Sequence, residues 1–350
     1  MSENSKIEWC DHTFNAWIGC TKISPGCDHC YAERERASTA LRVVWGAGNP
    51  RHRTAASTWN NPKRWNARHG EFFAKHDRRQ RVFCASLSDV FDNAVPPAWR
   101  MDLFRLIGDT PNLDWLLLTK RIGNAAAMLC EIGLDRLPDN VWLGATIVNQ
   151  EEADRDIPKL LAVPARVRFL SMEPLLGPVD ISRHLDYCEK LDKHGISRRA
   201  GGQHIKCDKH CGISWVIAGG ESGAGARLMH PDWARSLRDQ CSAAGVPFFF
   251  KQWGQWRPAA DATNEQLEAA RAHGWVSLDG AFHDASDERA FRPGDERVIS
   301  VGKKLAGRIL DDVIHHALPS DRPTTGSAER LPGRPGPQSR TVPHDGGQRA

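Results

Sequence analysis

A series of short apolar segments, separated by longer amphipathic ones, constrains the fold of this chain most strongly. Six of the short segments are residues 81–86, 114–118, 141–146, 167–171, 215–218 and 246–250. Residues 16–18 add a seventh near the amino terminus. A strand that is apolar along most of its length is buried on both faces, which is typical of a parallel sheet covered by helices.

The segments between these strands have the spacing of amphipathic helices. They are residues 97–108, 124–132, 151–161 and 231–244, and residues 305–318 are expected to form a last helix. This alternation predicts an α/β fold, a complete or partial (β/α) barrel of about seven parallel strands. An open doubly wound sheet is the alternative.

The chain of 350 residues is long enough for one large domain. We expect a single barrel-like domain over residues 1–318, with an insertion at 182–213. From 319 to 350 the chain is rich in Pro, Gly, Ser, Thr and Arg and has almost no large apolar residue. This tail is therefore expected to be disordered.

The net charge of +4 permits a nucleic-acid partner but does not argue for one. Without a basic stripe, the thirteen tryptophans are interpreted as core aromatics rather than as a stacking surface for bases. No stretch approaches the roughly 18 apolar residues of a membrane helix, and residues 1–8 lack the apolar core of a signal peptide. We expect a cytoplasmic protein with no membrane partner, and a protein partner stays open.

Each predicted strand is followed by polar or glycine residues. These strand-end residues are Cys20, Asp89, Lys120, Asn149, Glu173, Glu221 and Lys251. In parallel α/β folds the carboxyl ends of the strands meet on one face, where the chemistry takes place. Asp89, Lys120, Glu173 and Lys251 are the catalytic candidates. The lysines suit a carboxylate or a phosphate, and the acids suit a ribose or acid–base work. Ordinary surface salt bridges are the alternative for each.

Cys20, Cys27 and Cys30 form a C-x6-C-x2-C pattern directly after the first predicted strand. Clustered thiols in a cytosolic protein usually bind a metal. A zinc site would need a fourth ligand, for which Cys10, His12 and His29 are at hand. Three thiolates can instead hold an iron–sulfur cluster that leaves one iron open. A cluster on the reactive face is favoured over zinc and over buried free thiols.

The glycine-rich segment 219–225 follows the strand at 215–218. Glycines at a strand end let a ligand approach the backbone closely. Gly219, Gly220, Glu221 and Ser222, together with Asn149, are therefore the candidates for binding a cofactor. A tight turn without a ligand is the alternative.

A second cysteine group lies in the polar insertion. Cys188, Cys207, Cys211 and His210 are candidate ligands for a zinc ion, which would stabilise a segment that has too few apolar residues for a core of its own. An auxiliary iron–sulfur cluster and a loop with incidental thiols are the alternatives.

Several of these motifs, in this order, resemble a known family. They are residues 17–33, 86–91, 116–121, 141–150, 168–180, 215–233 and 246–256. The chain resembles a phage-associated family of unknown function with a three-cysteine motif, which is similar to radical S-adenosylmethionine enzymes. Those enzymes use a (β/α) barrel with a three-cysteine loop after the first strand.

The resemblance implies that Cys20, Cys27 and Cys30 ligate three irons of a [4Fe–4S] cluster. The open iron would bind S-adenosylmethionine, and reduction would cleave its C–S bond to give a radical that abstracts hydrogen from a substrate of unknown class. The usual spacing is C-x3-C-x2-C, and a Gly-Gly-Glu motif usually follows the second strand. Here it follows about the sixth, so the role of that motif is not carried over to Glu221.

Two functions therefore compete. The first is an iron–sulfur protein that cleaves S-adenosylmethionine reductively. The second is a zinc-stabilised module without catalysis, which binds nucleic acid or serves in phage biology or defence.

Overall fold

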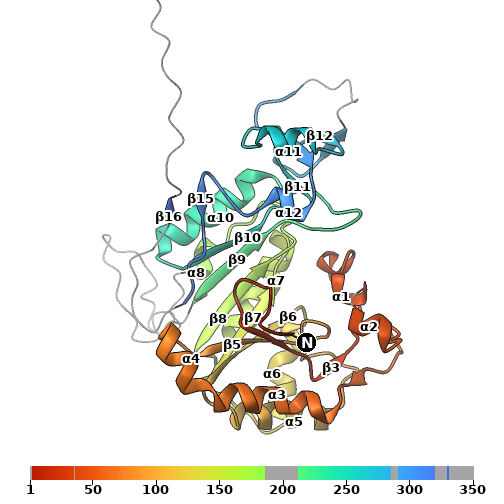
Figure 1. Ribbon diagram of the computed structural model, residues 1–350, viewed down its shortest axis with the longest axis vertical. Helices are drawn as coiled ribbons and strands as arrows, with labels where there is room; N and C mark the ends of the chain where they lie inside the picture. The colour runs from red at the N-terminus through yellow and green to blue at the C-terminus, as the bar shows by residue number, and fades with distance from the viewer. Residues whose placement is uncertain (1, 35, 186–211, 285–290, 320–328, 331–350) are drawn as a thin grey trace, which may run out of the picture.

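The computed structural model describes residues 2–34, 36–185, 212–284, 291–319 and 329–330. Its largest sheet has seven parallel strands that follow one another in sequence order (Figure 1). They are β2 (His12–Phe14), β5 (Gln80–Cys84), β6 (Leu113–Thr119), β7 (Val141–Thr146), β8 (Val167–Met172), β9 (Trp215–Gly219) and β10 (Phe248–Gln252). A doubly wound sheet reverses its strand order at a switch point, and this sheet does not. The fold is a half-barrel, which confirms the prediction of a partial (β/α) barrel.

Helices cover the outer face of the half-barrel. They are α3 (Ala56–Ala67), α4 (His69–His76), α5 (Pro97–Gly108), α6 (Ile122–Glu131), α7 (Gln150–Ala162), α8 (Ser182–Leu185) and α10 (Pro231–Ala244). The larger apolar cluster lies between them and the sheet and includes Leu103 of α5, Ile157 of α7 and Leu237 of α10. None of the helices in the described parts of the chain combines the length and apolarity that a membrane crossing needs.

The inner face of the sheet is filled by aromatic rings toward the amino ends of the strands. Trp215 of β9 packs against Trp142 and Phe169, with ring centroids 6.3 and 5.6 Å away, and against Phe249 at 6.1 Å. Trp9, which lies just before β2, completes this cluster, and its ring centroid is 6.2 Å from that of Trp215. Burial of such large rings excludes water from the part of the half-barrel near the amino ends of the strands.

Both edges of the sheet are covered by short antiparallel segments. β1 (Ser2–Glu3) pairs with β2 at one edge. At the other edge the N–H of Phe250 donates to the carbonyl of His315 at 3.0 Å, and Phe249 forms an antiparallel bridge with His316. An open parallel sheet would otherwise expose unpaired backbone groups at each edge.

A second, antiparallel sheet follows the half-barrel in sequence and lies at the top of Figure 1. Its strands, in spatial order, are β11 (Trp256–Pro258), β14 (Glu296–Ser300), β12 (His273–Val276) and β13 (Phe282–Asp284). Two short helices accompany it, α11 (Asn264–Glu268) and α12 (Lys303–Ala306). This sheet was not predicted from the sequence, because its strands are short and only partly apolar.

The prediction that residues 16–18 form the first strand of the barrel was wrong. Trp17–Ile18 is β3, which pairs with β4 (His52–Arg53) outside the main sheet. The position beside β5 is taken by β2. Its polar residue His12 is tolerated inside the protein because its ring lies 2.5 Å from the side-chain oxygen of Gln80 and stacks on Trp65 at 4.1 Å. Hydropathy does not reveal a strand whose polar side chain is satisfied inside the protein.

The predicted helix at 305–318 was also wrong. α12 ends at Ala306, and Asp311 and Asp312 have φ values of 51° and 60°, which end any helix. The chain continues as β15 (Val313–Ile314) and pairs with β16 (Glu329–Arg330). These two residues are the part of the predicted tail beyond 319 that the structure describes, and the rest of the tail lies outside the described residues.

Gly144 provides a test of the inner packing. A Cβ atom at this position would overlap the ring of Phe169. Phe169 cannot move away easily because Trp215 packs against it. We expect Gly144→Ala to lower the free energy of unfolding by about 1–3 kcal/mol, as overpacking does.

Gly108 is the matched control, since a Cβ there would have no neighbour within 4 Å. Gly108→Ala should change stability by no more than about 0.5 kcal/mol. Phe169→Leu should restore part of the loss in the Gly144→Ala protein. Equal denaturation midpoints for the two glycine variants would contradict this packing.

Candidate functional site

The cysteine segment, residues 20–30, crosses the carboxyl ends of the parallel strands. It contains a short 3-10 turn, η1 (Pro25–Cys27), and leads into α1 (Tyr31–Arg34) and α2 (Arg36–Ala40). The Oγ atom of Ser24 caps the turn by accepting from the N–H of Gly26 at 3.0 Å. Cys27 is buried, and Cys20 and Cys30 are half-buried.

Arg121, two residues after the end of β6, holds the start of the cysteine segment. Its Nη1 atom donates to Sγ of Cys20 at 3.2 Å, and its Nη2 atom donates to the carbonyl of Thr21 at 2.5 Å. Burial raises the pKa of the Cys20 thiol to about 11, against the opposing effect of the Arg121 charge. The positively charged guanidinium of Arg121 therefore lies in contact with the thiol of Cys20.

Asp89, after β5, anchors this arginine. Its Oδ2 atom lies 3.4 Å from Nη1 of Arg121 and accepts from the N–H of Lys120 at 3.0 Å. Its Oδ1 atom accepts from the hydroxyl of Thr119 at 2.7 Å and from the N–H of Phe91 at 2.9 Å. The carboxylate of this catalytic candidate is thus occupied by four donors from the ends of two neighbouring strands.

Gly26 brings the middle of the cysteine segment against the ends of β6 and β7. A Cβ atom on Gly26 would lie 2.8 Å from Cγ1 of Val148 and 3.5 Å from Cε of Lys120. Only a glycine allows this approach, so the backbone of the segment rests on the Lys120 side chain. The Nζ atom of Lys120 lies 3.4 Å from Oγ1 of Thr146 on β7.

Glu152 in the first turn of α7 also holds this part of the segment. One carboxylate oxygen accepts from the hydroxyl of Ser24 at 2.7 Å, and the other accepts from the N–H of Val148 at 3.0 Å. Asn149, predicted to bind a cofactor, caps α7 by accepting from the N–H of Glu152 at 2.9 Å.

The end of the cysteine segment is held by the loop after β9. Glu221 accepts from the Nε and Nη2 atoms of Arg227 at 3.0 and 2.7 Å, and it lies 2.9 Å from Nδ1 of His29. Arg227 also donates to Asp28 at 2.9 Å and to the carbonyl of Pro25 at 2.8 Å. Burial alone would raise the pKa of Glu221, but the hydrogen bonds from Arg227 outweigh it and hold that pKa below its ordinary value.

The glycines of this loop are needed for backbone packing. A Cβ on Gly220 would overlap the carbonyl oxygen of Trp253, and one on Gly219 would lie 3.2 Å from that of Gln252. The loop after β9 is therefore packed directly on the end of β10. Ser222 is half-buried in the same loop.

Glu173 and Lys251 meet across the end of β9. Glu173 follows β8, Lys251 lies on β10, and their side-chain atoms Oε2 and Nζ are 2.6 Å apart. Gln252 adds a hydrogen bond to the other oxygen of Glu173 at 2.8 Å. The strand between them ends in Gly219, which leaves room for this pair.

The structure thus brings most of the predicted strand-end residues to one face. Two groups, around Asp89 and around Glu221, hold the cysteine segment, and the pair of Glu173 and Lys251 forms a third at the same end of the sheet. Arg227 and Glu152 were missed because neither ends a predicted strand, and no spacing pattern marks them.

Within the described residues, no three His, Cys, Asp or Glu side chains are arranged to hold a single metal ion. All seven described cysteines are free thiols. The second cysteine group, with His210, lies outside the described residues.

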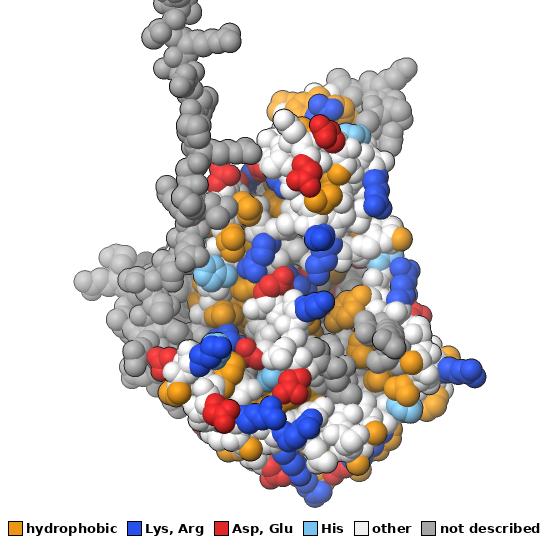
Figure 2. Space-filling view, in the orientation of Figure 1, with side chains coloured by type: hydrophobic (Ala, Val, Ile, Leu, Met, Phe, Trp, Pro, Cys, Tyr) orange, Lys and Arg blue, Asp and Glu red, His pale blue; other side chains and the backbone are white. Residues whose placement is uncertain are grey.

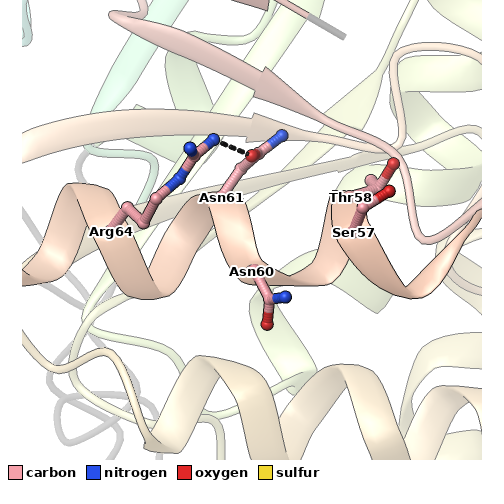
Figure 3. A pocket seen from close by; sticks show the side chains of 5 residues that line it. All are labelled: Ser57, Thr58, Asn60, Asn61 and Arg64. Carbon is pink, nitrogen blue, oxygen red and sulfur yellow. Dashed lines mark hydrogen bonds between the residues drawn. The ribbon is translucent and has the colours of Figure 1, made fainter.

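Two pockets lie away from this face. One is lined by Ser57, Thr58, Asn60, Asn61 and Arg64 of α3, and Figure 3 shows Asn60 pointing away from Asn61 and Arg64. Figure 2 shows positive and negative side chains interspersed over the face that it draws, rather than a field of one sign.

A family model described as "Protein of unknown function (DUF5131)" matches residues 4–319. No curated protein matches the chain. Two solved structures, both of spore photoproduct lyase mutants, are similar at 12% identity. One is a mutant with a cysteine replaced by serine, and its TM-score is 0.36 over 81% of this chain and 71% of the other. The second is a double mutant with bound AdoMet and dinucleoside spore photoproduct, with a TM-score of 0.30 over 65% and 60%. Similarity this low does not establish a shared function.

Removal of the Arg227 contacts should loosen the cysteine segment. Hydrogen bonds between charged groups are worth about 1.5 kcal/mol or more, and about 1.4 kcal/mol is a tenfold change in an opening equilibrium. We expect Arg227→Gln to increase the rate at which Cys27, only 7% exposed, reacts with a thiol reagent by about tenfold. Peptide mass spectrometry measures that rate.

Arg235→Gln is the matched control, because Arg235 is similarly exposed but pairs with Asp232 and Asp311 away from the segment. The control should leave the reactivity of Cys27 unchanged. Equal rates in the Arg227 variant and the wild-type protein would show that the loop after β9 does not hold the segment.

Proposed function

The chain belongs to this family of unknown function, and we propose that it is an iron–sulfur protein of the radical S-adenosylmethionine type. The observation that carries the proposal is the cysteine segment, held across the carboxyl ends of a half-barrel with Arg121 bonded to the sulfur of Cys20. Chemistry in parallel α/β folds takes place at this end of the strands.

The charges around the segment fit anionic sulfur. Arg121 lies 3.2 Å from the sulfur of Cys20, and the stem of Lys120 lies beneath Gly26, next to Cys27. A cation stabilises a thiolate, which is the form that binds a metal. Burial raises the pKa of Cys84 and of Cys241 in the apolar core and of Cys20 as well, but only at Cys20 does a neighbouring cation, Arg121, oppose the effect of burial.

Cys20, Cys27 and Cys30 would hold three irons of a [4Fe–4S] cluster. Bound there, the cluster would supply the single electron that reductive cleavage of the C–S bond of S-adenosylmethionine requires. The aromatic rings of the inner face, centred on Trp215, would keep water out of the space beneath.

The remaining strand-end residues divide into two kinds. Asp89, Asn149 and Glu221 have their side-chain oxygens engaged by protein donors, so we assign them a positioning role. Glu173 is of the same kind, because its two oxygens accept from Lys251 and Gln252. Lys120, beneath the cysteine segment, and Lys251 are cations at this end of the sheet, and we assign them to the cofactor or the substrate. Free thiols and an oxygen-sensitive cluster suit a reducing compartment, and we propose the cytoplasm.

Single cysteine replacements test this proposal. After anaerobic reconstitution with iron and sulfide, the wild-type protein should be brown and contain about four irons per chain. Cys20→Ala, Cys27→Ala and Cys30→Ala should each lose most of that iron, as measured by chemical analysis and absorbance.

Cys130→Ala is the control, since Cys130 is exposed and outside the segment. It should retain the wild-type iron content. Iron retained in Cys27→Ala would show that the ligand assignment is wrong. A colourless wild-type protein with stoichiometric zinc and no iron would favour the zinc-stabilised, non-catalytic module instead.

A further inference from the structure

We infer that Arg121 raises the reduction potential of the cluster through its hydrogen bond to the sulfur of Cys20, an inference that rests on the proposed function. The guanidinium contacts the ligand residue and its neighbour together, since Nη1 donates to Sγ of Cys20 and Nη2 to the carbonyl of Thr21. The two contacts fix the plane of the guanidinium against the start of the cysteine segment.

Arg121 is prepositioned by its own surroundings. The carboxylate of Asp89 lies 3.4 Å from Nη1, and that carboxylate is in turn fixed by the hydroxyl of Thr119 and the N–H of Lys120. The N–H of Arg121 also donates to Thr119 at 2.8 Å. The donor therefore keeps its place without depending on a bound metal.

Little water reaches this contact. The side chains of Arg121 and Asp89 are only 7% and 5% exposed. A guanidinium is charged at all ordinary pH values, so a positive charge stands beside the sulfur of Cys20. Solvent screens this charge less than a surface charge, although the Asp89 carboxylate offsets part of it.

A donor at this position favours the reduced cluster. Reduction adds one negative charge, and the sulfur of a ligating cysteine carries part of it. A hydrogen bond and a positive charge at that sulfur stabilise the reduced form more than the oxidised form. Loss of the donor should therefore lower the potential and make the cluster harder to reduce.

Arg51 offers a close comparison within the same part of the fold. It is also a buried guanidinium, 1% exposed, with Nε 2.8 Å from Asp92. Its Nη2 atom donates to Oγ1 of Thr21 at 2.7 Å, so it contacts the cysteine segment one residue after Cys20. Its hydrogen bonds go to oxygen atoms rather than to sulfur.

The test is a redox titration of the reconstituted protein, followed by electron paramagnetic resonance, with dithionite as the reductant. Arg121→Gln should have a lower midpoint potential than the wild-type protein. Arg121→Lys keeps a charge but not the two-pronged donor, so its potential should lie between them. Arg51→Lys should match the wild-type protein.

An intact cluster in both Arg121 variants with an unchanged or higher potential would overturn the inference alone. If Arg121→Gln fails to fold or to take up iron, the comparison of Arg121→Lys with Arg51→Lys decides. A wild-type protein that takes up no cluster would overturn the proposed function, and the inference with it.

Discussion

Ion pairs at both ends of the cysteine segment hold it across the open end of the half-barrel. At the start of the segment, Arg121 joins Cys20 to Asp89, and at its end Arg227 joins Pro25 and Asp28 to Glu221. Because these partners follow β5, β6 and β9, the segment depends on the placement of strands that are far apart in sequence. Its geometry is therefore a property of the whole sheet rather than of a local motif.

The sheet could be predicted largely from hydropathy, because doubly buried strands are apolar throughout. The helix at 231–244 and six of the seven parallel strands were confirmed in the structure. The first strand was missed because His12 is polar but satisfied by Gln80. The segment at 305–318 has helical periodicity, yet it covers the edge of β10, since pairing with an exposed strand outweighs local preference.

Residues at this face could be predicted from the sequence only where they stand at the end of a strand. Asp89, Glu173 and Lys251 could be placed at the carboxyl ends of the strands because each stands where an apolar run stops, and in the structure they lie on one face. Their partners could not be predicted, because Arg227 reaches the cysteine segment through a loop with no periodic signal. Side-chain partners depend on distances between loops, which spacing in the sequence does not encode.

We propose that the three cysteines hold a cluster with one open iron at the mouth of the half-barrel. The most direct measurement is the electron paramagnetic resonance spectrum of the reduced, reconstituted protein before and after S-adenosylmethionine is added. We expect a [4Fe–4S] signal whose shape changes on addition, because the compound would bind the open iron. A cluster signal that is unaltered by S-adenosylmethionine, or no cluster signal at all, would contradict it.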